Sequence, residues 1–257
     1  LMAVVAERIV DSGILHLIKQ WLKAPVIGED DNGVKKTVGG GKSNRKGTPQ
    51  GGVISPLLAN GYLHLLDRLW QRHHLKGKLQ AHLVRYADDF VILCQSAEQA
   101  QMALEEVRVW VEVNGLSLHP DKTHIGDCLL EGQGFEFLGY RFEAGKRTVR
   151  KKSLQRFKDK IREKTSRTRG DSMARIIADL TPMIRGWYGY FKHACRWTFP
   201  GLDGFIRRRL RAILRKQEKR PGYGRCHADQ RRWPNAYFAE LGLFTMTEAR
   251  MSASQSR

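Results

Sequence analysis

The sequence has few cysteines and no long hydrophobic run. A stretch of about 18 apolar residues, which a transmembrane helix requires, is absent. The first ten residues include Glu7 and Arg8 and show no cleavage pattern, so they do not resemble a signal peptide. The four cysteines form no Cys-x-x-Cys pair. Their spacing argues against a zinc ribbon or a disulfide scaffold and favours a protein of the reducing cytosol.

A phosphate-binding P-loop is also missing. Residues 28–47 are rich in glycine and lysine and contain VGGGKSNRKG. The P-loop pattern G-x-x-x-x-G-K-S requires glycine at the position that Lys36 occupies. We therefore predict that this segment is a loop with a strand on either side.

The whole chain has a net charge of +19, and the positive charge is concentrated in its second half. Residues 1–140 hold 15 Lys and Arg against 16 Asp and Glu, whereas residues 141–257 hold 30 against 10. A well-solvated surface is the simplest explanation, but so uneven a distribution favours a polyanion partner such as nucleic acid. A membrane fits less well, because no acylation signal or Trp-anchored amphipathic terminus is present.

Two adjacent carboxylates, Asp88 and Asp89, interrupt the segment LVRYADDFVILC, which spans residues 83–94. The apolar residues on either side predict two strands of a hairpin inside a core. An Asp pair is common in ordinary turns. However, two anions that lose water between strands need a counter-charge, which a divalent cation supplies efficiently. The pattern therefore raises the hypothesis of a two-metal phosphoryl-transfer site.

Hydrophobic periodicity predicts a fold of the α+β class. Strand patterns flank Asp88 and Asp89. GFEFLGYRF (134–142) alternates apolar and polar residues and, with Ala144-Gly145 as the turn, predicts another hairpin, whereas LSLHPDKT (116–123) predicts a loop with a short strand. Two helix N-termini are indicated, by Ser55 before Pro56 and by Ser96 with Gln99. A helix C-terminus is indicated by Gly115. The expected helices cover 1–23, 55–70, 96–114, 153–168, 172–193 and 202–219.

The helix expected at 202–219 is intensely basic. Five arginines fall between residues 207 and 215, and four of them would cover much of the surface opposite the buried stripe. We expect these four to contact nucleic-acid phosphates: Arg207, Arg208, Arg211 and Arg215. Aromatic residues gather just before this helix, between Trp187 and Phe199. Most such residues belong to a core, and a minority stack on bases.

Four blocks of the chain resemble one protein family, in the expected order. Tyr86-Ala87-Asp88-Asp89 resembles the YADD motif of reverse transcriptases. TPQGGVISPLLAN (48–60) resembles the block that precedes this motif in group II intron reverse transcriptases and their bacterial relatives. FLGY (137–140) resembles the primer-grip turn, and the region from about 150 resembles the thumb, or maturase domain X. A YADD motif alone is not specific, whereas four ordered blocks cover nearly the whole chain.

The resemblance implies a right-hand polymerase palm, an antiparallel sheet with packed helices, within residues 1–150. A mostly helical thumb and maturase domain would follow in residues 151–257. The implied activity is RNA-directed DNA polymerisation, together with binding of intron RNA and assistance in its splicing. The implied partners are intron RNA, an RNA template with a DNA primer, and deoxynucleoside triphosphates, with no membrane.

Roles are also implied for individual residues. Asp88 and Asp89 would bind two Mg²⁺ ions, and Lys122 would lie near the triphosphate as a cation or proton donor. The remaining implied contacts are with the nucleotide or template (Tyr86, Gln50, Gly51 and Gly52) and with the primer (Phe137, Leu138, Gly139 and Tyr140).

The chain departs from the family pattern in two ways. Polymerases of this kind use a third catalytic Asp on an earlier palm strand, and Asp11, which lies in a helical pattern, does not qualify. We expect the fingers and that strand to lie upstream of Leu1, so that this chain is a piece of a longer protein and does not polymerise alone. The chain also lacks a His/Cys-rich segment resembling the endonuclease module that some members append.

Two alternatives remain open at this stage. One is an RNA-binding maturase that only assists splicing and has an incomplete polymerase site. The other is a host-defence or diversity-generating reverse transcriptase, since those share YADD-like and glycine blocks. The basic tail with WYGYF and RRRLRAILRK resembles a maturase domain more closely.

Overall fold

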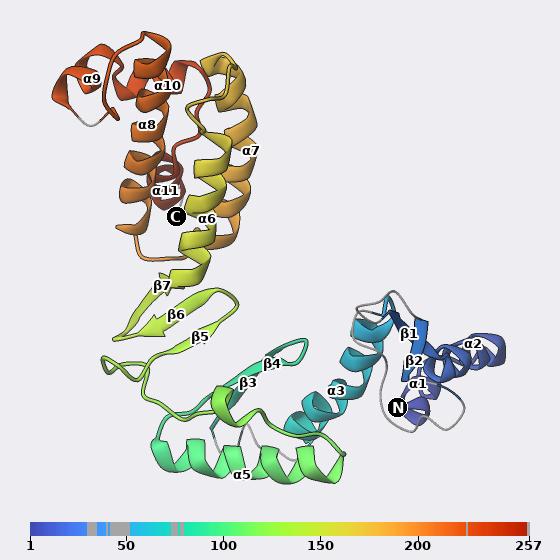
Figure 1. Ribbon diagram of the computed structural model, residues 1–257. Coiled ribbons are helices and arrows are strands. Elements are labelled where there is room, and N and C mark those ends of the chain that lie inside the picture. Colours follow the sequence, from blue (N-terminus) through green and yellow to red (C-terminus); the bar gives the residue numbers. More distant parts are fainter. Residues whose placement is uncertain are drawn as a thin grey trace. The chain divides into compact units, whose positions relative to one another are not determined.

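The computed structural model describes residues 1–29, 35–39, 41, 52–72, 77, 80–224 and 226–255 (Figure 1). The chain divides into two compact units, Leu1–Ile125 and Gly126–Arg257, which we describe separately. The strands around residue 140 therefore group with the C-terminal helices. The domain boundary expected after residue 150 stays a prediction, because a compact unit and an evolutionary domain need not end at the same residue.

The first unit opens with two helices, α1 (Met2–Ala6) and α2 (Ser12–Lys23), where the sequence predicted one helix over 1–23. The single-helix prediction is wrong because Asp11 caps α2. Its side chain accepts a hydrogen bond from the Ile14 backbone N–H at 2.9 Å.

Two strands follow, β1 (Val26–Glu29) and β2 (Lys35–Gly39), which pair antiparallel. β2 lies inside the segment that the sequence predicted as a loop, rather than after it. α3 (Ser55–Arg72) then begins at Ser55, which is its first helical residue and not its cap. The preceding carbonyl, that of Ile54, accepts the first helical hydrogen bond from the Leu58 N–H at 3.1 Å.

The Asp-Asp segment forms the predicted hairpin, from β3 (His82–Tyr86) and β4 (Asp89–Leu93). One face of the hairpin packs on α3 and α5 (Ala97–Val113), around a small core of Leu66, Trp70, Ala81, Ala103, Val107 and Val111. The other face is exposed, including Val84 and Tyr86. The predicted strands are therefore confirmed, but only one face of the hairpin lies against a core.

The ends of α5 follow the predicted pattern. The Ser96 side chain accepts a hydrogen bond from the Gln99 backbone N–H at 3.3 Å. At the other end Gly115 has a φ of 70°, and the Leu116 N–H donates to the Val111 carbonyl at 2.9 Å, as in a Schellman motif.

The short strand predicted within residues 116–123 is absent. Residues Pro120–Lys122 form a single turn of 3₁₀ helix, η1. Pro120 has no backbone N–H to donate to a strand ladder and its φ is fixed, which favours the turn.

The second unit begins with a three-stranded antiparallel sheet in chain order: β5 (Phe135–Phe137), β6 (Tyr140–Glu143) and β7 (Lys146–Val149). Its turns, Leu138-Gly139 and Ala144-Gly145, have positive φ at both positions, as type I′ turns require. The sequence predicted a hairpin in which the run 134–142 turns at Ala144-Gly145. That turn is confirmed, but the Leu138-Gly139 turn divides the run into two strands, β5 and β6.

Six helices complete the second unit as far as the structure describes it. The three long ones confirm the predicted helices, although α8 begins four residues earlier than expected. Their buried faces form the main core, which includes Ile176, Leu180 and Ile184 of α7 and Ile206 and Leu210 of α8. The helices are α6 (Lys151–Lys164), α7 (Met173–Phe191), α8 (Thr198–Gln217), α9 (His227–Arg232), α10 (Asn235–Glu240) and α11 (Met246–Gln255).

The three short helices α9 to α11 were not predicted. Each spans ten residues or fewer, and the segment that holds them is interrupted by Pro221, Pro234 and Gly242. Over the described part of the chain, no helix combines the length and apolar character that crossing a membrane requires.

Candidate active site and nucleic-acid interface

Asp88 and Asp89 lie at the tip of the β3–β4 hairpin. Tyr86 pairs with Asp89 across the strands, so Ala87 and Asp88 form a two-residue turn. Ala87 has a φ of 54°, a conformation that non-glycine residues rarely adopt. Both carboxylates are exposed, and neither forms a hydrogen bond or ion pair with another residue that the structure describes. A strained turn thus presents two free carboxylates to solvent.

Arg85 holds this turn in place. Its guanidinium donates to both carboxylate oxygens of Asp67 on α3, at 2.9 and 2.5 Å. It also donates to the Ala87 carbonyl at 2.7 Å and to the Asn60 side chain at 3.0 Å. The hydrogen bonds from Arg85 lower the pKa of Asp67, although partial burial acts in the opposite direction. The pair therefore remains ionised and links the turn to α3.

Sequence reasoning missed Arg85 and Asp67. An arginine beside the motif is visible in the sequence, but its partner lies 18 residues earlier on another element. Only the packing of α3 against the hairpin identifies the pair.

The two carboxylates fit Mg²⁺ in chemistry but do not complete a site. Carboxylate oxygens are the ligands that Mg²⁺ prefers, and both side chains are accessible. Across the described residues, no group of three or more His, Cys, Asp and Glu side chains is arranged to hold a metal ion. Asp88 and Asp89 are thus candidate ligands for part of a metal site.

The other residues expected to contact the nucleotide or template differ in exposure, and two of them lie outside the described residues. Tyr86 is 65% exposed at the end of β3, on the open side of the hairpin. Gln50 and Gly51 lie outside the described residues. Gly52 is described, and its carbonyl accepts a hydrogen bond from the Ser55 N–H at 3.1 Å at the start of α3. Lys122 is exposed in η1.

The predicted primer-grip segment Phe137 to Tyr140 forms the first type I′ turn of the second unit. Two tyrosines fix it to the end of α7. The Tyr190 hydroxyl donates to the Leu138 carbonyl at 2.8 Å, and the Tyr140 hydroxyl donates to the Tyr190 carbonyl at 2.6 Å. A Cβ at position 139 would lie 3.3 Å from the Phe191 ring, so glycine suits both the space and the φ of 79°.

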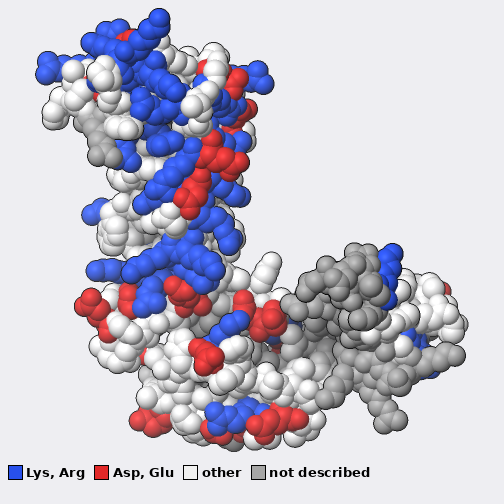
Figure 2. All heavy atoms as spheres, in the orientation of Figure 1, with Lys and Arg blue, Asp and Glu red and all other residues white. Residues whose placement is uncertain are grey.

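Lys and Arg side chains gather over the helices of the second unit (Figure 2). The expectation that four α8 arginines share an exposed face is wrong for Arg211, which is buried. Arg211 donates to the Trp233 carbonyl at 3.0 Å and to the Asn235 side chain at 2.9 Å. Burial, followed by the nearby charge of Arg207, lowers its pKa.

Arg215 also has partners inside the unit. It donates to the Asp229 carboxylate at 2.6 Å and to the Pro221 carbonyl at 2.8 Å. By contrast, Arg207 and Arg208 are partly exposed and form no ion pair with a described residue. Of the four arginines, these two are the most accessible to a polyanion.

A second basic helix was missed by sequence reasoning. α6 has seven Lys and Arg among its 14 residues, and most of them are exposed. The signal is visible in the sequence as KKSLQRFKDKIREK, although this run is less dense in arginine than that of α8.

The aromatic cluster divides as expected into core and surface. Tyr188, Phe191 and Phe199 are buried, whereas Tyr190 and Trp197 are 55% and 58% exposed. Since Tyr190 is bound to the β5–β6 turn, Trp197 has the freer ring of the two exposed residues.

Comparison with known proteins gives the same order of domains. Residues 3–142 match the family described as Reverse transcriptase (RNA-dependent DNA polymerase), and residues 154–233 match the Group II intron, maturase-specific domain. The chain is 31% identical over 173 residues to Protein YkfC of Escherichia coli (strain K12), which covers 55% of this chain and 42% of that protein.

A second relative is the Putative COX1/OXI3 intron 2 protein of Saccharomyces cerevisiae (strain ATCC 204508 / S288c). It is 23% identical over 269 residues, which covers 83% of this chain and 30% of the yeast protein. The chain thus spans less than half the length of either relative. Because the reverse transcriptase match covers more than half of the chain and the maturase-specific match follows it, this chain belongs to the group II intron reverse transcriptase and maturase family.

Proposed function

We propose that this chain contributes two metal-binding carboxylates and an RNA-binding thumb to an RNA-directed DNA polymerase that also assists the splicing of group II intron RNA. The observation that carries the proposal is the pair of exposed carboxylates, Asp88 and Asp89, on a turn braced by Arg85. Family membership supplies the reaction class.

Each residue of the hairpin has a proposed role. Asp88 and Asp89 would bind Mg²⁺, which when bound activates the primer 3′-hydroxyl and neutralises the departing pyrophosphate. Tyr86 would contact the nucleotide sugar or the primer end from the open side of the hairpin. Arg85 acts as a positioning residue, because it holds the Ala87 carbonyl and thereby the turn.

Further contacts are proposed for the other motifs. Gln50, Gly51 and Gly52 would let the backbone approach the template or nucleotide closely, since glycine has no Cβ. Lys122 would supply a cation or a proton near the triphosphate. The Leu138-Gly139 turn would contact the primer and is supported in that role by its two tyrosine hydrogen bonds.

A third carboxylate is needed for activity under this proposal. The described residues hold no three-ligand cluster, and two carboxylates alone bind a divalent cation less tightly than three. We therefore propose that the chain as given does not extend a primer and that a longer form, with a further palm strand carrying a carboxylate, does.

Mg²⁺-dependent primer extension on an RNA template tests the proposal. The chain as given, the longer form and the longer form with Asp88→Ala would be compared. Glu106→Ala provides a matched control, because Glu106 is an exposed carboxylate on α5 and not part of the Ala87-Asp88 turn. We expect extension by the longer form and by its Glu106→Ala variant only. Extension by the chain as given, or by the Asp88→Ala form, would contradict the proposal.

A splicing-only maturase is the second candidate. The concentration of basic residues in the second unit and the incomplete metal cluster favour it. It predicts tight binding of intron RNA with no extension in any form. The match to the maturase-specific domain favours either of these functions over a defence or diversity-generating reverse transcriptase.

A further inference from the structure

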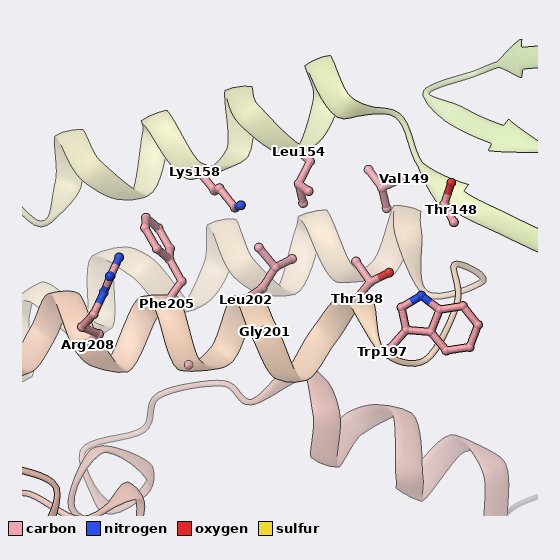
Figure 3. A pocket seen from close by; sticks show the side chains of 11 residues that line it. Thr148, Val149, Leu154, Lys158, Trp197, Thr198, Gly201, Leu202, Phe205 and Arg208 are labelled. Atoms are coloured by element: carbon pink, nitrogen blue, oxygen red, sulfur yellow. The ribbon is translucent and has the colours of Figure 1, made fainter. Parts of the chain in front are cut away.

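A groove runs between α6 and α8 in the second unit (Figure 3). Its volume is about 630 Å³, which falls within the range of about 300–1,000 Å³ typical of ligand sites. Leu154 and Leu202 contribute apolar side chains to it. Trp197 lies at one end, and Phe205 with Arg208 at the other. Among the described residues, no acidic side chain lines the groove.

Two glycines of α8 keep the groove open. Gly201 and Gly204 are three residues apart, and both line it. A Cβ added at either position would meet no atom within 4 Å, so no close contact inside the unit requires glycine there. Glycine is less favourable than alanine in a helix. Their absent side chains leave space that the fold itself does not use.

The groove has an exposed aromatic ring at one end. Trp197 is 58% exposed, more than any other tryptophan of the chain. Lys146 lies above the ring, with its Nζ 6.0 Å from the ring centroid. An exposed indole beside a cation is the arrangement on which nucleic-acid bases stack in single-strand binding proteins.

Two cations, Lys158 and Arg208, also line the groove. Figure 3 shows Lys158 of α6 extending into it, and Arg208 next to Phe205. The Arg208 guanidinium lies 5.4 Å from the Phe205 ring centroid. Neither Lys158 nor Arg208 forms an ion pair with a carboxylate of the described residues. Their charges are therefore available to the phosphates of a strand that runs along the groove from Trp197.

We propose that this groove binds a short unpaired stretch of RNA, with one base stacked on Trp197 and the phosphates of the adjoining nucleotides running along the groove past Lys158 toward Arg208. Base faces inside a duplex are already stacked on their neighbours, so only a single-stranded or bulged nucleotide offers a free face. The site therefore distinguishes unpaired RNA from duplex RNA. This inference rests on the proposed function, because it assumes that the second unit binds RNA.

The test is a comparison of two RNA probes on the full chain. One probe is a uridine-rich single strand, and the other is the same strand annealed to its complement. Trp197→Ala is expected to lower affinity for the single strand about tenfold and to leave duplex affinity unchanged. Trp197→Phe should restore most of the loss. Trp21→Ala is the control, since Trp21 is 48% exposed in the first unit.

Filling the groove gives a second, independent variant. Gly204→Leu adds a side chain where a Cβ meets no neighbour, so the fold should persist while the path of the strand along the groove is obstructed. We expect it to reproduce the selective loss of single-strand affinity. Equal losses for both probes, or no loss with Trp197→Ala and Gly204→Leu, would overturn the inference. If the unmodified chain binds neither probe, the proposed RNA-binding function itself fails.

Discussion

Arg85 connects the candidate metal ligands to the rest of the first unit. Its guanidinium forms two hydrogen bonds to Asp67 and one to the Ala87 carbonyl. Arg85→Lys keeps the charge but removes the planar fork, so we expect the free energy of unfolding to fall by about 1–2 kcal/mol. Urea unfolding followed by circular dichroism measures the change.

Arg108→Lys is the matched control for this prediction. Arg108 pairs with Glu105 on the surface of α5, where both side chains are about half exposed. An exposed helix pair contributes little, and we expect a loss below about 0.5 kcal/mol. If the two variants lose equal stability, the bracing role of Arg85 is wrong.

The Asp67 carboxylate should also make stability depend on pH. Hydrogen bonds from Arg85 hold the pKa of Asp67 below its ordinary value. Such a group stabilises the fold above its unfolded-state pKa of about 3.9, and the contribution is lost as the pH falls through the lower native pKa. We therefore expect the stability difference between the chain and its Asp67→Asn variant to shrink below about pH 4.

Urea unfolding at a series of pH values measures this difference. A His64→Gln background is used for both proteins, because the His64 ring also contacts Asp67 at 3.4 Å and would add a second interaction to the measured difference. A difference that stays constant down to the acid limit of folding would argue against an ionised Asp67–Arg85 pair.

At the scale of single residues, the sequence identified those whose role is evident from the residues next to them in the chain. Asp88 and Asp89 stand out because apolar strands flank them. Arg85 and Arg211 do not, because their roles depend on partners 18 and 24 residues away. A guanidinium can serve as a surface cation or as an internal tie, and only the folded neighbours decide which.

Among the elements, α8 contains a glycine whose replacement should stabilise it. A Cβ at Gly204 meets no atom within 4 Å, and its backbone is helical. Gly204→Ala should therefore raise the free energy of unfolding by roughly 0.5–1 kcal/mol. Chemical unfolding of the two proteins tests this directly.

Gly224→Ala should have the opposite effect and serves as the contrast. Gly224 has a φ of 71°, and a Cβ there would lie 2.8 Å from the Ala212 backbone nitrogen. We expect a loss of more than about 1 kcal/mol, from strain and overpacking together. A stabilised Gly224→Ala variant would show that this account of the two glycines is wrong.

Element prediction succeeded where a local period was long and clear. The apolar stripes of α7 and α8 recur over five turns, and both helices were predicted. The short helices α9 to α11 were missed, because so few turns give no reliable period. The strand expected near Lys122 failed for another reason, since Pro120 cannot donate to a ladder.

For the whole molecule, the order of motifs was enough to identify the family, because each motif is a short local pattern. The charge asymmetry also needed no structure, since it depends only on composition. By contrast, the structure was needed to separate the basic residues that bond within the unit from those that are accessible. Some cations of the second unit bind carbonyls and carboxylates of the same unit, and others remain accessible on its surface.

This division predicts how RNA affinity depends on salt. Arg207 and Arg208 are partly exposed and form no ion pair with a described residue, so each is expected to neutralise about one phosphate. The double variant Arg207→Gln with Arg208→Gln should bind every RNA less tightly. It should also reduce the slope of log affinity against log salt by about 2.

Arg211→Gln is the control for this double variant. Arg211 lies on the same helix, four residues after Arg207, but donates to Trp233 and Asn235. Its loss should lower the free energy of unfolding while leaving the salt slope of the folded protein unchanged. Fluorescence anisotropy over a range of salt concentrations, paired with urea unfolding, separates the two effects. A slope that falls equally in Arg211→Gln would mean that the buried guanidinium reaches the RNA after all, and the assignment of its contacts as structural would fail.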